Sequence, residues 1–185
     1  MRVIILDLDH TLVHSVKILD DDNFDKDESC GSNGVQLNTG YVCFKRPNVD
    51  VFLRWCFRKF DRVLIWSAGT NNYVNEIIDV MFGEFSFDLV LGRNECDYGY
   101  YKDFTSKIVR DKFRKKSIHI KRSDVYFVDD KMHRVQNSKG VTLMAIEPFE
   151  TKWKDVIQSS KKRKRPIREK DNYLLEVRDK ISVSI

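Results

Sequence analysis

The sequence predicts an α/β fold with a mostly parallel central sheet. Short apolar runs rich in β-branched residues alternate with segments whose apolar residues recur at helical spacing. Strands buried on both faces are apolar throughout, and parallel strands need a helical connection between them. Acidic residues and a hydroxyl follow directly after several of the apolar runs. We therefore expect helices on both faces of a sheet and polar side chains along one of its edges.

The first part of the chain predicts a buried strand followed by an insert. The run Val3–Leu6 has the composition of a strand that is buried on both faces. The acidic segment Asp20–Gly34 is expected to be a solvated loop. Beyond it, Val35–Leu37 and Tyr41–Phe44 flank the turn residues Asn38–Gly40, and this pattern predicts a β-hairpin.

The rest of the chain predicts helices and strands in alternation. Pro47 is expected to open a helix, because proline suits a first helical turn and apolar residues follow at helical spacing. A later helix, running to about residue 116, is expected to be capped by Asp103 or Thr105. The other expected elements are strands at 62–66, 87–91, 125–128 and 141–146, a helix at 72–82 and a last docking helix at 173–177. Together they predict a Rossmann-like three-layer fold.

The composition is that of a globular protein, with 42% hydrophobic and 33% charged residues in a chain of 185. No apolar run approaches the ~20 residues of a membrane span, so no membrane partner is expected. The first residues do not resemble a signal or transit peptide. The four scattered cysteines indicate neither a zinc site nor a disulfide framework. The expected location is intracellular, in the nucleus or the cytoplasm.

The positive charge is concentrated in the C-terminal tail. Residues 151–185 carry 11 basic and 5 acidic side chains, whereas the whole chain has a net charge of +5. The run Lys161–Arg165 suits a nuclear localisation signal, a patch for nucleic acid or a patch for an acidic protein. A solvated tail without a partner explains it as well. We divide the chain into a main domain at 1–158, with an insert at about 16–44, and a basic tail at 159–185.

Candidate functional residues gather at the ends of the predicted strands. They are Asp7, Asp9 and Thr11 after the first strand, Ser67 after the second, Lys102 before the helix that follows the third, and Asp129 and Asp130 after the fourth. Clustered carboxylates repel unless a cation is close, and hard oxygen ligands on an open edge favour Mg²⁺. Helix caps or exposed turns explain single carboxylates, but they do not explain the whole set.

These residue types together suit phosphoryl transfer. A metal-bound Asp7 carboxylate can attack phosphorus and form an aspartyl-phosphate. Asp9 can protonate the leaving oxygen and then deprotonate the water that hydrolyses the intermediate. Mg²⁺ and Lys102 can neutralise the phosphoryl oxygens, to which Ser67 can donate a hydrogen bond. The sequence therefore predicts a Mg²⁺-dependent phosphatase with Asp7 as its nucleophile.

Several segments also resemble the motifs of a known family. In chain order, they are D-L-D-H-T-L-V-H-S at 7–15, K-R-P-N-V-D-V-F-L at 45–53, W-S-A at 66–68, Y-K-D at 101–103 and V-D-D at 128–130. They resemble the motifs D-L-D-E-T-L-V-H-S, K-R-P-x-x-D-x-F-L, F-T-A, Y-V-K-D-L and L-D-N or D-D. These motifs belong to the small phosphatases of the RNA polymerase II C-terminal domain, the NLI-interacting-factor-like group of the haloacid dehalogenase superfamily. The resemblance covers roughly residues 1–158.

The resemblance implies a phosphatase domain without a large cap, in which the insert is a β-hairpin flap beside an open cleft. Such a cleft suits phosphoserine or phosphothreonine in a protein substrate. Asp7 would be both nucleophile and metal ligand, and Asp9 would give the metal its backbone carbonyl as well as act as acid and base. Asp130 would be the third protein ligand, and Asp129 would support the metal site.

Substrate recognition is where the chain departs from the family. The candidate substrate-binding residues are Arg93, Ala68 and Tyr73. Arg93 would help to hold phosphate, and Tyr73 matches the family. The family has an aromatic residue at the position of Lys17 and a leucine at that of Thr70, and the aromatic helps to form an apolar pocket for a substrate proline. A peptide like the RNA polymerase II C-terminal domain remains the expected substrate, with a weaker proline pocket.

Two other functions are compatible with the sequence. One is a phosphatase for a small metabolite or a nucleic-acid end, and the open cleft disfavours the small metabolite. The other is a catalytically inactive binding module with the same fold, which the retention of Asp7, Ser67 and Lys102 disfavours. The sequence makes no prediction of the oligomeric state.

Overall fold

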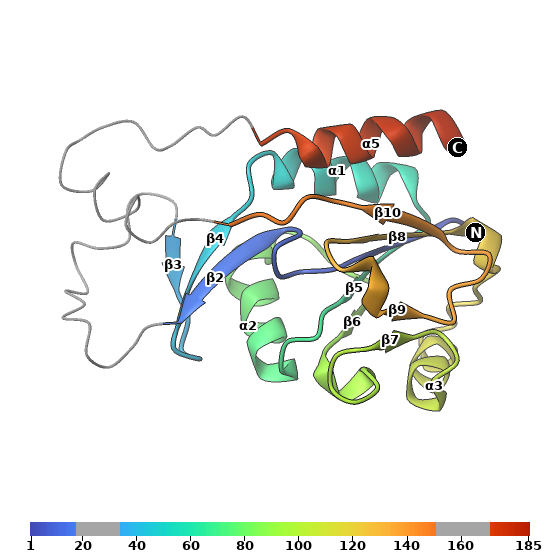
Figure 1. Ribbon diagram of the computed structural model, residues 1–185, viewed down its shortest axis with the longest axis horizontal. Helices are drawn as coiled ribbons and strands as arrows, with labels where there is room; N and C mark the ends of the chain where they lie inside the picture. Colours follow the sequence, from blue (N-terminus) through green and yellow to red (C-terminus); the bar gives the residue numbers. More distant parts are fainter. Residues whose placement is uncertain (18–33, 151–170) are drawn as a thin grey trace.

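A computed structural model describes residues 1–17, 34–150 and 171–185, and its centre is a five-stranded sheet (Figure 1). The strands lie in the order β10-β8-β1-β5-β6, and all neighbouring pairs run parallel. In chain order they are β1 (Val3–Leu6), β5 (Arg62–Trp66), β6 (Leu89–Leu91), β8 (Val125–Asp129) and β10 (Thr142–Ala145). The parallel sheet predicted from the apolar runs is confirmed.

Strand β1 occupies the centre of the sheet because all of its residues are apolar and buried. Leu6 is in register with Ile65 of β5 on one side and with Val128 of β8 on the other. The chain therefore leaves these three strands at nearly the same level. This register brings Asp7 and Asp129 to one edge of the sheet.

Helices cover both faces of the sheet and give the predicted three layers. They are α1 (Val49–Lys59), α2 (Asn71–Phe82), α3 (Lys107–Lys115) and α5 (Tyr173–Ser184). Helices α1, α2 and α5 share a hydrophobic core with Leu6, whereas α3 packs on the opposite face with Ile5. Figure 1 shows α5 alongside α1 on one side of the sheet and α3 on the other. In the described part of the chain, no helix is long and apolar enough to cross a membrane.

Helix α3 begins later than the sequence predicted. Its N-cap position is Ser106, so the prediction that Asp103 or Thr105 caps it is wrong. Asp103 lies in the short strand β7 (Lys102–Asp103), which pairs with β9 (Val135–Gln136), and its carboxylate accepts a hydrogen bond of 2.6 Å from the backbone N–H of Thr105. Strand pairing thus removes Asp103 from the helix. The described residues also form three short 3-10 helices: η1 (Arg93–Glu95), η2 (Arg122–Asp124) and η3 (Met132–Arg134).

The insert forms a small antiparallel sheet where the sequence predicted a hairpin flap. Its strands are β2 (Val13–Lys17), β3 (Gly34–Gln36) and β4 (Tyr41–Lys45), with β4 in the middle. The β3–β4 hairpin is confirmed, whereas β2, which pairs with β4 over its whole length, was not predicted. The carboxylate of Glu76 in α2 accepts hydrogen bonds from Asn38 and Thr39, and so fastens the turn of this flap to the main domain. The acidic loop predicted at 20–34 falls almost wholly outside the described residues.

The C-terminal helix predicted at 173–177 is present as α5, and it continues to Ser184. Its residues Leu174, Val177 and Ile181 are buried in the core that α1 shares. The basic run Lys161–Arg165 lies outside the described residues.

Arg46, directly after β4, ties α5 to the loop that follows β1. Its guanidinium is fully buried and donates hydrogen bonds to the carbonyls of His10 (3.3 Å), Thr11 (3.2 Å) and Glu147 (2.8 Å). Its Nε lies 2.9 Å from the carboxylate of Asp171, which precedes α5. The carboxylate of Asp171, far from Arg46 in the sequence, therefore neutralises its buried positive charge.

We predict that Asp171→Asn lowers the free energy of unfolding by about 3 kcal/mol, because it leaves the buried guanidinium of Arg46 without a counter-charge. Urea denaturation followed by circular dichroism measures the change. Asp179→Asn is the matched control, since Asp179 lies in α5, is 67% exposed and pairs with Arg178. The control should change stability by less than about 1 kcal/mol. Equal losses in the two variants would contradict a special role for the buried pair.

Candidate active site

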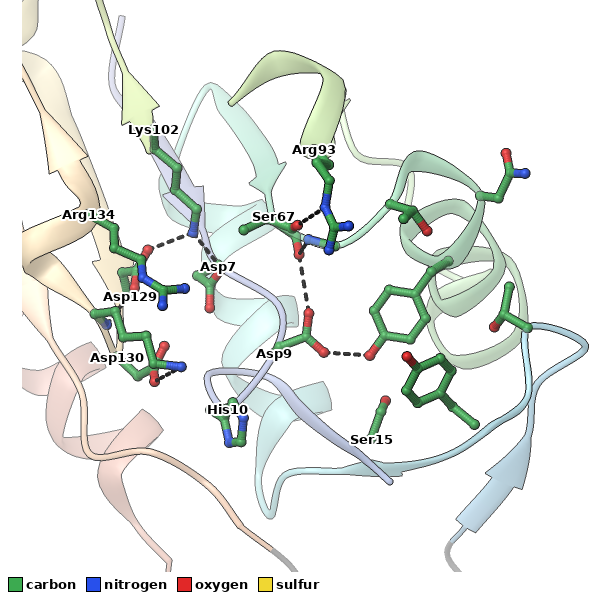
Figure 2. Close-up of a pocket in the computed structure, with 18 residues that line it drawn as sticks. Asp7, Asp9, His10, Ser15, Ser67, Arg93, Lys102, Asp129, Asp130 and Arg134 are labelled. Carbon is green, nitrogen blue, oxygen red and sulfur yellow. Dashed lines mark hydrogen bonds and ion pairs between the residues drawn. The ribbon is translucent and has the colours of Figure 1, made fainter. Parts of the chain in front are cut away.

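A pocket of about 530 Å³ opens at the carboxyl edge of the central sheet (Figure 2). It is bounded by the segments that follow β1, β5 and β8 and by the flap. Of the site residues predicted from the sequence, the ones that line it are Asp7, Asp9, Ser67, Ala68, Tyr73, Arg93, Lys102, Asp129 and Asp130. The remaining one, Thr11, is buried behind them.

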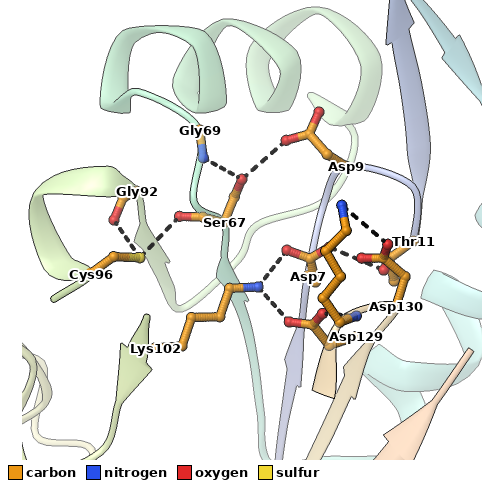
Figure 3. A network of polar contacts seen from close by, with 11 residues as sticks. Asp7, Asp9, Thr11, Ser67, Gly69, Gly92, Cys96, Lys102, Asp129 and Asp130 are labelled. Atoms are coloured by element: carbon orange, nitrogen blue, oxygen red, sulfur yellow. Dashed lines mark hydrogen bonds and ion pairs between the residues drawn. The ribbon is translucent and has the colours of Figure 1, made fainter. Parts of the chain in front are cut away.

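Asp7 follows β1 and is held by a buried lysine (Figure 3). The Nζ atom of Lys102 lies 2.5 Å from Oδ1 of Asp7 and 2.6 Å from Oδ2 of Asp129, and all three side chains are buried. The hydroxyl of Thr11 donates a hydrogen bond of 3.1 Å to Oδ2 of Asp7. Both carboxylate oxygens of Asp7 therefore have a neighbour that fixes their orientation.

Burial and charge act against each other in this group. Burial raises the pKa of Asp7 to about 7, an effect that Lys102 opposes and Asp129 reinforces. Burial alone would lower the pKa of Lys102, but the charges of Asp7 and Asp129 outweigh it and the pKa is raised. Lys102 therefore stays protonated and places a full positive charge beside Asp7.

The carboxylate of Asp9 contacts a second group of residues, from the end of β5 and from α2. It accepts a hydrogen bond of 3.2 Å from the Ser67 hydroxyl and another from the Tyr73 hydroxyl. Ser67 in turn accepts a hydrogen bond of 3.0 Å from the backbone N–H of Gly69 (Figure 3). Burial and the nearby charge of Asp9 raise the pKa of Tyr73, so its phenol remains a proton donor. Asp7 and Asp9 thus share one pocket, but separate neighbours orient them.

Three carboxylates form a group that can hold a metal ion. One oxygen atom from each of Asp7, Asp129 and Asp130 lies within 4.8 Å of the others. Hard oxygen donors at an open sheet edge fit a hard divalent cation. The Asp9 carboxylate is not part of this group, and its oxygens accept the hydrogen bonds from Ser67 and Tyr73.

Arg93 lines the pocket on the wall formed by the segments that follow β5 and β6. Its Nε donates a hydrogen bond of 3.0 Å to the carbonyl of Ala68, and its backbone N–H donates one of 2.7 Å to the carbonyl of Gly69. These two bonds fix the position of a guanidinium that lines the pocket (Figure 2). Two of the predicted substrate-binding residues, Arg93 and Ala68, are thus in direct contact.

Some residues that line the pocket were not predicted as site residues. Lys131 and Arg134 belong to the segment directly after the carboxylate pair 129–130, so their position in the chain was an available signal. Tyr41 comes from the flap and packs its ring against Tyr73, with centroids 5.2 Å apart. No sequence pattern indicated this aromatic contact, because it joins two segments that are distant in the chain.

A family model described as NLI interacting factor-like phosphatase matches residues 2–165 of this chain. The comparison with curated proteins yields no match.

Two solved structures share the fold. One is Fcp1, an essential RNA polymerase II CTD phosphatase, with a TM-score of 0.55 and 20% identity over 80% of this chain and 42% of that chain. The other is the fission yeast RNA polymerase II CTD phosphatase Fcp1 bound to beryllium fluoride, with a TM-score of 0.55 and 15% identity over 99% of this chain and 56% of that chain. This chain therefore spans about half the length of these neighbours. The likeness confirms the predicted Rossmann-like three-layer fold.

We predict that Lys102→Met lowers the melting temperature in the presence of EDTA by roughly 6–12 °C, because the buried carboxylates of Asp7 and Asp129 lose their counter-charge. Thermal denaturation followed by circular dichroism measures the shift. Arg114→Met serves as the control, since Arg114 is 78% exposed and pairs with Asp111 on the surface. Its melting temperature should stay close to that of the parent protein. A Lys102→Met variant as stable as this control would contradict the prediction.

Proposed function

Because this chain belongs to the family of NLI interacting factor-like phosphatases, we propose that it is a Mg²⁺-dependent phosphatase that removes phosphate from phosphoserine or phosphothreonine in proteins. Asp7 is the nucleophile, and the reaction proceeds through an aspartyl-phosphate. The observation that carries this proposal is the buried Asp7 carboxylate, held by Lys102 at 2.5 Å and by Thr11 at 3.1 Å beside the pocket.

The first step transfers the phosphoryl group to Asp7. A carboxylate oxygen of Asp7 forms a bond to phosphorus while the bond from phosphorus to the serine oxygen breaks. Asp9 donates its proton to that oxygen, so the serine leaves as a neutral alcohol. The hydrogen bonds from Ser67 and Tyr73 support this role, because they hold the Asp9 carboxyl at a fixed place in the pocket.

The second step returns Asp7 to its starting state. Asp9, now ionised, accepts a proton from a water molecule whose oxygen attacks phosphorus. The bond between phosphorus and the Asp7 oxygen breaks, and inorganic phosphate is released. Asp9 therefore acts first as an acid and then as a base, with its proton restored at the end of each cycle.

Positive charge in the pocket stabilises the phosphoryl oxygens in both steps. Lys102 is protonated beside Asp7, and Arg93 and Ser67 supply further donors. The donor set of Asp7, Asp129 and Asp130, with the backbone carbonyl of Asp9, would hold Mg²⁺. When bound, Mg²⁺ supplies positive charge that stabilises the phosphoryl group and lessens the repulsion between the carboxylates.

We infer a protein substrate rather than a small metabolite from the family to which the chain belongs. The two solved neighbours are RNA polymerase II CTD phosphatases, so a phosphopeptide like that domain is the best-supported substrate. Thr70 lines the pocket, whereas Lys17 lies exposed at the end of β2 outside it. We propose that residues 1–158 form the phosphatase domain, that the basic tail at 159–185 contacts an acidic protein or nucleic acid, and that the enzyme acts in the nucleus or the cytoplasm.

We predict that Asp7→Asn lowers kcat/KM for Mg²⁺-dependent hydrolysis of p-nitrophenyl phosphate by at least about a thousandfold, because the amide is not a nucleophile. EDTA should abolish the activity of the parent protein, and added Mg²⁺ should restore it. Asp88→Asn is a control far from the pocket, since Asp88 pairs with Arg62 at the opposite end of β5. A folded parent protein without Mg²⁺-dependent hydrolysis would favour an inactive binding module instead.

We predict that Asp9→Asn gives a burst of about one equivalent of p-nitrophenolate, followed by slow turnover. This leaving group departs without protonation, whereas hydrolysis of the aspartyl-phosphate still needs the base. Stopped-flow absorbance measures the burst. Uniform loss of both phases, or full turnover at the parent rate, would contradict the two roles given to Asp9.

A further inference from the structure

Two basic residues on the rim of the pocket have no part in the chemistry proposed above. Lys131 and Arg134 line the pocket. Figure 2 shows Arg134 on the side of Asp129 and Asp130, away from Arg93. The guanidinium of Arg134 lies over the ring of Tyr100, 5.7 Å from its centroid. Among the described residues, no carboxylate lies within ion-pair distance of Arg134. Its hydrogen-bond donors therefore remain available to a ligand.

The rim segment is held in place at both of its ends. At its start, the backbone N–H of Lys131 donates a hydrogen bond of 2.6 Å to Oδ1 of Asp129. At its end, Arg134 directly precedes β9, whose residue Val135 is in register with Lys102 of β7. Within the segment, the N–H of Arg134 donates a hydrogen bond of 2.8 Å to the carbonyl of Lys131. The Arg134 guanidinium is thus presented by a fixed turn, which lowers the entropy lost when it binds a ligand.

The cations of the pocket differ in how fully they are engaged. Lys102 contacts two carboxylates, and Lys131 contacts Asp130 at a longer distance of 3.6 Å. Arg93 uses its Nε for the carbonyl of Ala68. Among the described residues, the guanidinium of Arg134 contacts only the face of Tyr100. One phosphoryl group beside Asp7 would engage Lys102 and Arg93, which leaves the guanidinium of Arg134 without an anion.

We propose that Lys131 and Arg134 form a second anion subsite, which binds an acidic side chain or a second phosphate close to the phosphoserine that is hydrolysed. A guanidinium suits this ligand because its paired N–H groups match the oxygens of a carboxylate or a phosphate. In an extended peptide, side chains two positions apart share a face and are separated by about 7 Å. This subsite rests on the proposed function, and it gives that function a substrate class: phosphopeptides with a neighbouring negative charge.

The test measures the binding of fluorescent phosphoserine peptides to the full-length Asp7→Asn variant with Mg²⁺, so that catalysis does not consume the probe. Three peptides share one sequence and differ at a single position, about two residues before or after the phosphoserine. That position is alanine, glutamate or a second phosphoserine. The two peptides with an added anion should bind about tenfold or more tightly than the alanine peptide. Adding Arg134→Gln should remove this difference, whereas adding Arg114→Gln, an exposed position on α3, should preserve it.

The outcomes separate the two proposals. Tighter binding of both anionic peptides supports a subsite for any anion, and tighter binding of the doubly phosphorylated peptide alone supports a subsite for phosphate. Equal affinity for all three peptides, or a difference that survives Arg134→Gln, would overturn the subsite. If the parent protein still hydrolyses all three peptides, the proposed function stands without it. A folded chain that neither binds nor hydrolyses any of them would overturn both.

Discussion

The buried contact of Lys102 with Asp7 and Asp129 holds the candidate active site together. It joins the ends of β1 and β8 to β7, which lies far from both in the chain. Two carboxylates lose their hydration here, and this is unfavourable unless a cation is close. The contact therefore requires both the register that sets β1 level with β8 and the pairing of β7 with β9.

A second buried cation holds the loop that runs from Asp7 to β2. His10 in this loop has a φ of 62°, a left-handed conformation that residues other than glycine seldom adopt. Arg46 donates hydrogen bonds to the carbonyls of His10 and Thr11, and Phe149 donates one of 2.7 Å to His10. The loop is thus held by partners from the flap and from the segment after β10, and through the Asp171 carboxylate its geometry is coupled to α5.

The parts of the structure that the sequence predicted are those that a local pattern specifies. Apolar runs predicted β1, β5 and β8, and the residues after them converged because parallel strands end at one edge. The missed parts depend on contacts between distant segments, such as the pairing of β2 with β4 and the bond from Arg46 to Asp171. The expected helix start at Asp103 failed for the same reason, because pairing with β9 competes with local capping. Periodicity shows which side chains face a core, but it does not identify their partners.

The residues proposed for chemistry and those proposed for substrate recognition belong to different kinds of structure. Asp7 and Asp9 follow the central strand β1, and neighbouring side chains contact both oxygens of each carboxylate. Arg134 and Tyr41 come from a short 3-10 helix and from the flap, where substitutions disturb the sheet less. Lys17, at the position of the family's aromatic residue, also belongs to the flap. With a lysine in place of that aromatic residue and basic residues on the rim of the pocket, this chain would recognise its peptide mainly through charge. Such recognition weakens as salt screens the charges.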